Sequence, residues 1–92
     1  MDETQEKLVR IVNGLGLHAR PAGQISREAQ KYQATITLSC QDAEADAKSI
    51  LDLLTLAAPK GTELRLRATG PDAPEALAGI SRLFEDMFGE TA

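Results

Sequence analysis

The sequence predicts an α+β domain with the element order βαββαβα, in which helices cover one face of a small antiparallel sheet. Apolar and polar residues alternate at 7–12, 34–40 and 62–68, as they do in strands with one buried face. At 19–32 and 73–88 the apolar residues recur at spacings of three and four, which is typical of helices that lie on a core. Because the outward strand positions are mostly Thr and Arg, we expect the other face of the sheet to meet water.

The first half of the chain is predicted to form a strand, a helix and a second strand. Residues 1–6 are polar and acidic, and we expect them to be a frayed terminus before a strand at 7–12. The first helix is expected to start at Ala19 and to run to about Lys31 or Tyr32. The second strand turns alternate side chains toward the core, namely Ala34, Ile36, Leu38 and Cys40.

The middle of the chain is predicted to contain a short strand, a short helix and a longer strand. Residues 43–46 are expected to be a strand although Ala, Glu and Asp favour strands poorly, so a neighbouring strand must hold them in the sheet. Ser49 is predicted to cap a helix at 50–55. The strand at 62–68 shows the clearest alternation, with an inward face made of Leu64, Leu66 and Ala68.

The last helix completes a prediction of four strands and three helices. We expect Asp72 to cap this helix, Pro74 to lie in its first turn and Gly89 to end it. Its apolar residues form one stripe that would lie on the core: Ala73, Ala76, Leu77, Ile80, Leu83, Phe84 and Met87.

Length and composition indicate one domain, residues 1–92, and exclude several classes of function. A net charge of −4 leaves no basic excess to neutralise DNA or RNA, and three aromatic residues provide no platform for stacked bases. No apolar run approaches the ~20 residues of a membrane span, and the acidic N-terminal residues do not resemble a secretory signal, so we expect a cytoplasmic protein. The single cysteine, Cys40, is expected in the core, without a zinc site.

The only histidine of the chain, His18, is the strongest candidate for chemistry. Residues 13–17 break the strand pattern with two glycines, and helical spacing begins at Ala19, so His18 is expected at the start of a helix. Unpaired N–H groups and a partial positive charge of roughly half a unit make a helix N-terminus an anion site, which Arg20 extends with donors that suit phosphate oxygens. The positive end also favours a neutral imidazole, which keeps one lone pair as a nucleophile. These features indicate a reversibly phosphorylated histidine; the alternative is that His18 only caps the helix and Arg20 is a solvated charge.

Three segments of the chain resemble a single family. Residues 13–22, Asn-Gly-Leu-Gly-Leu-His-Ala-Arg-Pro-Ala, resemble the active-site signature of HPr, the histidine-containing phosphocarrier of the bacterial phosphoenolpyruvate-dependent sugar phosphotransferase system (the HPr/NPr family). Residues 46–56 resemble the regulatory-serine region of that family, and residues 60–64 resemble the beginning of its last strand. The resemblance extends from about residue 7 to residue 88 and implies an open-faced β-sandwich of four antiparallel strands with three helices on one face.

The resemblance implies a stoichiometric phosphocarrier, not an independent enzyme. His18 would accept a phosphoryl group on its δ nitrogen from phosphorylated enzyme I and pass it to a histidine of an enzyme IIA domain, in support of sugar uptake. Arg20 would steady the phosphoryl group. The resemblance implies no metal and no cofactor, and we expect a monomer that does not insert into membranes.

Ser49 has two possible roles. A helix cap alone would explain a serine at this position, typically for ~1 kcal/mol. The resemblance adds phosphorylation of Ser49 by an HPr kinase/phosphorylase, which would bring negative charge to a surface that partners use. Asp52 stands where a glycine is usual in the family, and its carboxylate would weaken recognition by that kinase or docking of acidic partners.

A partner-docking surface is expected beside His18. A helix as short as 50–55 cannot bury all its apolar residues, so we expect Leu53 and Leu56 inside and the others at least partly exposed. The alternative is that Ile50 and Leu54 belong to the core. The family docks its partners on this helix and on the start of the first helix, which here implicates Ala19, Arg20, Ile50, Leu51, Leu54 and Thr55, while Arg27 and Lys31 would add a basic face that attracts acidic partners.

Two other functions are alternatives to sugar transport. In the nitrogen-related, NPr-like branch of the family the same chemistry serves regulation, and the residues near His18 do not separate the two branches. A regulatory phosphoprotein controlled through Ser49 would act mainly by docking to other proteins. The presence of His18 argues against a pure binding module, which could lose the nucleophile without harm.

Overall fold

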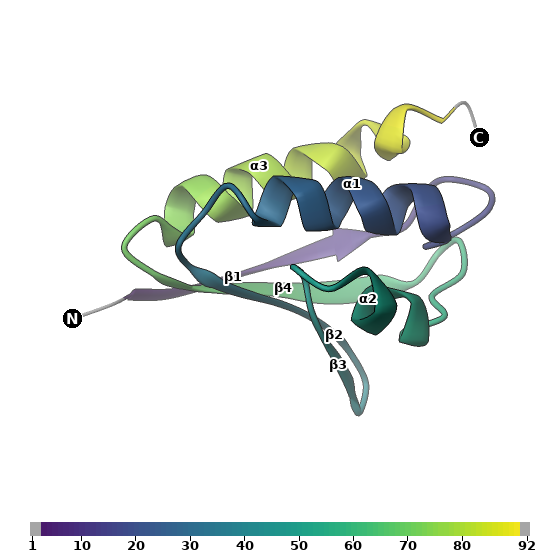
Figure 1. Ribbon diagram of the computed structural model, residues 1–92. Coiled ribbons are helices and arrows are strands. Elements are labelled where there is room, and N and C mark those ends of the chain that lie inside the picture. Colours follow the sequence, from purple (N-terminus) through teal and green to yellow (C-terminus); the bar gives the residue numbers. More distant parts are fainter. Residues whose placement is uncertain (1–2, 91–92) are drawn as a thin grey trace.

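A four-stranded antiparallel sheet forms the base of the molecule, and the helices cover one of its faces (Figure 1). The computed structural model describes residues 3–90. Its elements are β1 (Glu3–Arg10), α1 (Ala19–Ala29), β2 (Thr35–Cys40), β3 (Ala43–Asp46), α2 (Ile50–Thr55), β4 (Glu63–Gly70), α3 (Ala73–Glu85) and a short 3₁₀ turn, η1 (Met87–Gly89). The predicted order βαββαβα is therefore confirmed.

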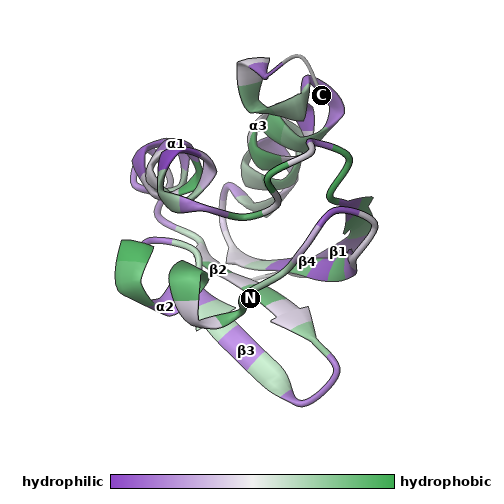
Figure 2. Cartoon of the chain, turned by 90° about the vertical axis from the view of Figure 1, so that its right-hand side faces the viewer, coloured by the Kyte–Doolittle hydropathy of each residue, from purple (hydrophilic) through white to green (hydrophobic). Residues whose placement is uncertain are grey.

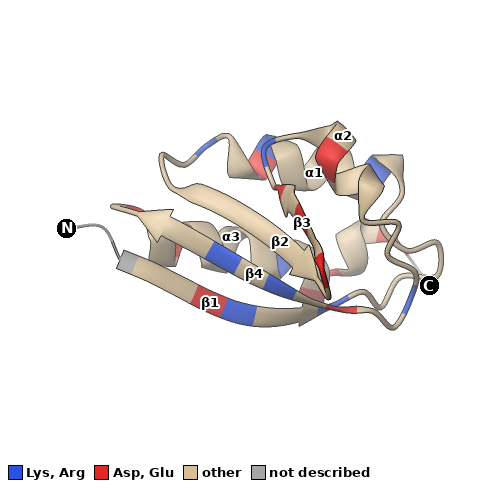
Figure 3. Ribbon diagram, turned by 90° about the horizontal axis from the view of Figure 1, so that it is seen from below, with Lys and Arg blue, Asp and Glu red and all other residues tan. Residues whose placement is uncertain are grey.

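The strands lie in the order β1-β4-β2-β3, with every neighbouring pair antiparallel. β4 is central: it pairs along its whole length with β1, from Glu3 opposite Gly70 to Arg10 opposite Glu63, and its other edge pairs with β2. The short β3 pairs only with β2, which explains how a segment with poor strand propensity is held in the sheet. Viewed from below, the strands lie in front of the helices (Figure 3).

The core lies between the sheet and the helices and follows the predicted alternation. In β4, Leu64, Leu66 and Ala68 are fully buried, and Ile36 and Leu38 of β2 lie beside them. The helices close this layer from above with their buried side chains: Ala22, Ile25 and Ala29 of α1, Leu53 of α2, and Ala73, Ala76, Leu77, Ile80 and Phe84 of α3.

The opposite face of the sheet meets water, as predicted. Glu6 of β1 forms ion pairs with Arg67 at 2.9 Å and Arg65 at 3.6 Å, both on β4. Acidic and basic residues accordingly follow these two strands in Figure 3. Because the ion pairs are exposed, each contributes little to stability. Among the helices that the structure describes, none is long and apolar enough to cross a bilayer.

Some predicted element boundaries were wrong, because strand pairing and packing extended or shortened local patterns. β1 begins at Glu3 instead of residue 7 and ends at Arg10 instead of residue 12, since it pairs with β4 only from Glu63 to Gly70. Residues 3–6 are therefore strand and not a frayed terminus, while residues 1–2 lie outside the described part. β4 likewise extends to Gly70. α1 ends at Ala29, short of the predicted Lys31 or Tyr32.

The end of α3 also differs from the prediction. The helix ends at Glu85 instead of continuing to Gly89, and η1 follows it. Met87 and Phe88 have φ angles of 53° and 55°, which interrupts the right-handed helix and turns the chain. Phe88 is nevertheless buried, and its ring meets that of Phe84 edge-on at a centroid distance of 4.9 Å. We infer that burying this aromatic ring stabilises the fold more than continuing the helix would.

Asp72 has a different role from the predicted helix cap. It lies at the N-cap position of α3, but within residues 3–90 its side chain makes no cap hydrogen bond. Its carboxylate instead accepts hydrogen bonds from the backbone amides of Gln33 and Ala34, each at 2.9 Å, just before β2. The bond from Gln33 lowers the pKa of Asp72, and the bond from Ala34 adds to this effect, although partial removal of water acts in the opposite direction.

An Asp72→Asn variant is expected to be less stable than the wild type at neutral pH, with a smaller difference in acid. Since the folded-state pKa of Asp72 lies below its unfolded value, its stabilising contribution is present above about pH 4 and is lost as the pH falls through the folded-state pKa. Urea midpoints at pH 7 and at several pH values below 4 measure this. Asp42→Asn, in the exposed turn between β2 and β3, is the matched control. A difference independent of pH would contradict the explanation.

Candidate functional site

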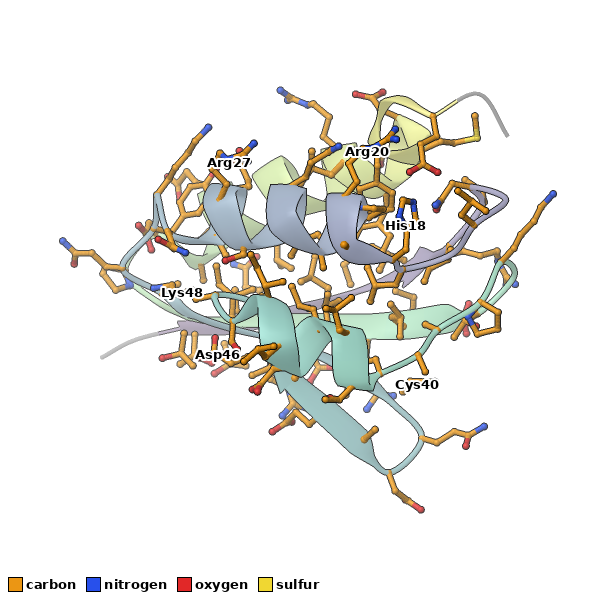
Figure 4. The ribbon with its side chains drawn as sticks, turned by 45° about the vertical axis from the view of Figure 1, so that its right-hand side comes forward. His18, Arg20, Arg27, Cys40, Asp46 and Lys48 are labelled. Carbon is orange, nitrogen blue, oxygen red and sulfur yellow. The ribbon has the colours of Figure 1, made fainter. Side chains whose placement is uncertain are left out.

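His18 lies at the start of α1, as predicted (Figure 4). Its backbone is extended, with φ −95° and ψ −168°, and its carbonyl accepts the first helical hydrogen bond, from the amide of Ala22, at 3.0 Å. Within the described residues, its side chain makes no cap hydrogen bond to the helix. The His18 ring is thus available for a role other than capping.

The loop before His18 is held against the segment that precedes β4. The amide of Leu17 donates to the carbonyl of Ala58 at 2.9 Å, and the amide of His18 donates to the carbonyl of Gly16 at 3.0 Å. Gly16 has a φ of +72°, and a Cβ there would lie 2.6 Å from the carbonyl oxygen of Ala58. Only glycine satisfies both the backbone angle and this close approach. The glycine therefore shapes the loop that presents His18.

Glu90, from the far end of the chain, completes the site. Its carboxylate oxygen Oε2 lies 2.7 Å from Nε2 of His18 and 4.0 Å from Nη1 of Arg20. The other oxygen, Oε1, accepts a hydrogen bond from Nδ2 of Asn13 at 3.0 Å. Only 8% of the Glu90 side chain is exposed. The structure thus places a buried acid beside the histidine.

Sequence reasoning missed Glu90. It follows the glycine predicted to end the last helix and is separated from His18 by 72 positions. No local pattern distinguishes it from the other acidic residues, since the contact depends on how the chain turns after α3. Asn13 lies in the segment that is predicted to break the strand pattern, but it is fully buried, and its Nδ2 also donates to the carbonyl of Gly16 at 2.8 Å.

The charge of Glu90 decides which nitrogen of the neutral His18 ring carries the hydrogen. Burial acts to raise the pKa of Glu90, but hydrogen bonds from Asn13 and His18, with the electrostatic effect of His18 and Arg20, together lower it below its ordinary value. Glu90 is therefore a carboxylate at neutral pH, and a carboxylate only accepts hydrogen bonds. Nε2 of His18 must carry the hydrogen of the 2.7 Å bond, which leaves the lone pair of the neutral ring on Nδ1.

Anion-binding groups surround this ring. The first amides of α1, those of Ala19 and Arg20, have no acceptor inside the helix, and the positive end of the helix dipole lies at the same point. The Arg20 side chain is 66% exposed and extends beside Glu90 and His18. A nucleophilic nitrogen, free amides and a guanidinium together form a site suited to a phosphoryl group.

Ser49 caps α2, as predicted. Its hydroxyl accepts a hydrogen bond from the amide of Asp52 at 3.2 Å. The Asp52 carboxylate accepts in turn from the amide of Asp46 at 3.2 Å, and Asp46 accepts from the amide of Lys48 at 2.9 Å. Two carboxylates thus already accept hydrogen bonds from backbone amides near Ser49. A phosphate on Ser49 would be repelled by their negative charge.

The expected exposure on α2 is confirmed. Ile50 is 44% exposed, Leu51 is 77% exposed and Leu54 is 37% exposed, whereas Leu53 is fully buried. The alternative that Ile50 and Leu54 belong to the core is therefore wrong. Figure 2 shows α2 as a largely hydrophobic element beside α1. The remaining residues of the expected docking surface, Ala19, Arg20 and Thr55, are exposed as well, and the structure adds an exposed leucine in the His18 loop that sequence reasoning did not single out, Leu15.

Three further residues, Cys40, Arg27 and Lys31, bear on metal binding and charge. Cys40 is partly buried against the core. In the part of the chain that the structure describes, no group of three His, Cys, Asp or Glu side chains is arranged to hold a metal ion. Arg27 lies on the exposed side of α1, but Lys31 is paired with Glu28 at 2.9 Å, so the predicted basic face is weaker than two free cations would make it.

The chain matches the family model for the PTS HPr component phosphorylation site over residues 5–86. It is 40% identical over 85 residues to a phosphocarrier protein HPr of Xylella fastidiosa, which covers 92% of this chain and 96% of the relative. It is equally 40% identical over 88 residues to the phosphocarrier protein NPr of Escherichia coli, covering 95% of this chain and 98% of the relative.

Solved structures agree with this match. An HPr crystal structure from Thermoanaerobacter tengcongensis superimposes with a TM-score of 0.91 at 34% identity, covering 96% of this chain and 99% of the other. A crystal structure of an HPr dimer from the same organism has a TM-score of 0.76 at 35% identity, covering 89% and 94%. The open-faced fold predicted from the sequence is that of these proteins.

Proposed function

Because this chain belongs to the HPr/NPr family of phosphocarrier proteins of the phosphotransferase system, we propose that it carries a phosphoryl group on His18 from one partner protein to another. The observation that supports this most directly is the bond from Nε2 of His18 to the carboxylate of Glu90, since in the neutral ring this bond leaves the lone pair on Nδ1, at the start of a helix. The nucleophile is thus prepared without a separate general base.

The transfer is a displacement between two histidines. Phosphorylated enzyme I presents its phosphohistidine, Nδ1 of His18 attacks phosphorus, and the bond from phosphorus to the donor nitrogen breaks, with its electron pair returning to the donor ring. In a second step a histidine of an enzyme IIA domain removes the group in the same way. Because bonds of one kind are exchanged, the reaction is nearly balanced in energy, and positioning of the groups decides the rate.

The residues around His18 have separate roles in this proposal. Arg20 and the first amides of α1 stabilise the phosphoryl oxygens during transfer. The exposed apolar residues of α2 bind the partner proteins and thereby bring the two histidines together, through Ile50, Leu51, Leu54 and Thr55. Each chain accepts one phosphoryl group and then donates it, so the protein acts as a stoichiometric carrier and not as an enzyme in its own right.

Sugar uptake, cytoplasmic location and a monomeric state are parts of the same proposal. The NPr-like alternative uses the same His18 chemistry, and the chain is 40% identical both to an HPr protein and to an NPr protein, so identity does not separate the two branches. Control through phosphorylation of Ser49 by an HPr kinase/phosphorylase is a further alternative, and the carboxylates of Asp46 and Asp52 next to Ser49 argue against it. Size-exclusion chromatography with light scattering tests the proposed monomeric state, for which we expect the mass of a single chain.

Phosphoryl transfer to the purified chain tests the proposal. The protein is mixed with phosphoenolpyruvate and enzyme I from the sugar branch or, separately, from the nitrogen branch, and its intact mass is measured without acid. We expect one phosphate per chain, lost on acid treatment as is typical of phosphohistidine, and passed on when an enzyme IIA domain is added. The branch whose partners react faster identifies the pathway. No uptake from either active enzyme I would refute the proposal.

An Arg20→Ala variant is expected to accept the phosphoryl group about tenfold to a hundredfold more slowly than the wild type, since one donor to the developing charge is lost. Initial rates at low enzyme I concentration measure this. Arg27→Ala removes the same charge from the exposed side of the same helix and is the matched control. Equal losses in both variants would show that the guanidinium acts only through long-range attraction of partners and not on the phosphoryl group.

A further inference from the structure

Glu90 is held beside His18 too firmly to be an incidental surface contact. We propose that Glu90 is a positioning residue for phosphoryl transfer: its carboxylate holds the hydrogen on Nε2, directs the reaction to Nδ1, and stabilises the positive charge that the ring gains when Nδ1 is phosphorylated. This inference rests on the proposed role of His18 as the phosphoryl acceptor.

The contact has the features of a constructed site. The Glu90 carboxylate is 8% exposed, and each of its oxygens has a partner: Nε2 of His18 at 2.7 Å and Nδ2 of Asn13 at 3.0 Å. Nδ2 of Asn13 also donates to the carbonyl of Gly16, while its Oδ1 has no hydrogen-bond partner among the described residues. Turning the amide over would point Oδ1 at two oxygens, so the acceptors Glu90 and Gly16 fix its orientation.

The backbone that delivers Glu90 is strained and anchored. Met87 and Phe88 both adopt the left-handed conformation, which costs free energy in residues other than glycine. Such a conformation persists only when the surroundings enforce it. Here the Phe88 ring is buried against Phe84, and Nε2 of Gln24, on α1, donates to the Phe88 carbonyl at 3.1 Å. The C-terminal turn is thereby tied to the helix that carries His18.

The chemistry of the transfer uses this carboxylate. In the neutral ring Nε2 keeps its hydrogen and Nδ1 donates its lone pair to phosphorus, while the donor's bond to phosphorus breaks. No proton moves, so the phosphorylated ring of His18 carries a formal positive charge beside the dianionic phosphoryl group. A carboxylate 2.7 Å from Nε2 stabilises that charge as it develops, in the way that a buried acid supports the histidine of a hydrolase triad. Without it, the neutral ring would also populate the tautomer with the hydrogen on Nδ1, in which that nitrogen cannot attack phosphorus.

Nitrogen NMR of the unphosphorylated protein tests the tautomer directly. Since the chain has one histidine, two ring nitrogen signals belong to His18 without further assignment. In the wild type at a pH where the ring is neutral, we expect the signal of a protonated Nε2 and an unprotonated Nδ1. In Glu90→Gln the amide can accept or donate, and we expect the two signals to move toward the average of a tautomer mixture. Glu75→Gln, an exposed acid in the first turn of α3, removes the same charge and should leave them unchanged.

Phosphoryl uptake then measures the consequence. With a common active enzyme I, we expect Glu90→Gln to accept phosphate about tenfold to a hundredfold more slowly than the wild type, and Glu75→Gln to match the wild type. Circular dichroism and thermal unfolding establish that both variants are folded. Because the tautomer is read before any phosphate is added, it separates positioning of the ring from a loss of structure.

The outcomes distinguish the two proposals. If the wild type takes up no phosphate, the proposed function fails whatever the tautomer. If the wild type is phosphorylated and Glu90→Gln has the same tautomer or the same rate, the role of Glu90 is refuted and that of His18 stands. A faster Glu90→Gln variant would also refute it, because the carboxylate would then compete with the phosphoryl group for Arg20. A shifted tautomer together with slower uptake supports the inference.

Discussion

A His18→Ala variant is expected to take up no detectable phosphate under conditions in which the wild-type chain gains one phosphoryl group. The substitution removes both ring nitrogens from the start of α1, and the structure offers no second histidine, since the chain contains one. Arg20 and the helix amides would remain, but they stabilise a phosphoryl group and cannot form a covalent bond to it. Intact mass measured without acid is the assay.

This result is informative only if the variant folds. The His18 side chain is 30% exposed and caps no helix amide within residues 3–90, so its loss should leave the circular dichroism spectrum and the cooperative thermal transition in place. Acid-stable phosphate on both proteins would place the modification on a hydroxyl, with Ser49 as the first candidate. Acid-labile phosphate on His18→Ala would refute the assignment of the site.

The largest loss of stability is expected for Leu66→Ala. Leu66 is fully buried in β4, the central strand, where it pairs with Lys7 of β1 on one side and Leu38 of β2 on the other. Truncation removes apolar contacts and leaves a cavity that a strand held on both sides cannot close. We expect a loss of about 2–5 kcal/mol in the free energy of unfolding, measured by urea titration.

Leu51→Ala is the matched control for this substitution. It makes the same change at a side chain that is 77% exposed on α2, and we expect the free energy of unfolding to stay within about 0.5 kcal/mol of the wild type. A comparable loss in the two variants would contradict the assignment of Leu66 to the core and Leu51 to the surface. The same Leu51→Ala protein also tests partner docking, through the rate at which it accepts phosphate.

Local sequence determined most of the elements of this fold. The alternation of apolar residues is sufficient for β2 and β4, and the spacing of three and four for α1 and α3, because each pattern records which side of an element is buried. Ser49 caps α2 through a bond to an amide three residues away, which spacing alone predicts. The position of His18 before α1 also follows from local sequence, because the glycine-containing loop ends at Leu17 and the helical spacing begins at Ala19.

Tertiary structure decided which distant residues meet. Asp72 had the sequence of a helix cap, but its carboxylate accepts hydrogen bonds from the amides before β2. β1 begins four residues earlier than its local pattern predicts, because β4 offers pairing partners there. Glu90 reaches His18 only because α3 ends early and Phe88 is buried in a left-handed turn. Residue spacing specifies contacts within one element, whereas contacts across 72 positions depend on how all the elements pack. The nucleophile could therefore be predicted from the sequence, but the buried acid that orients it could not.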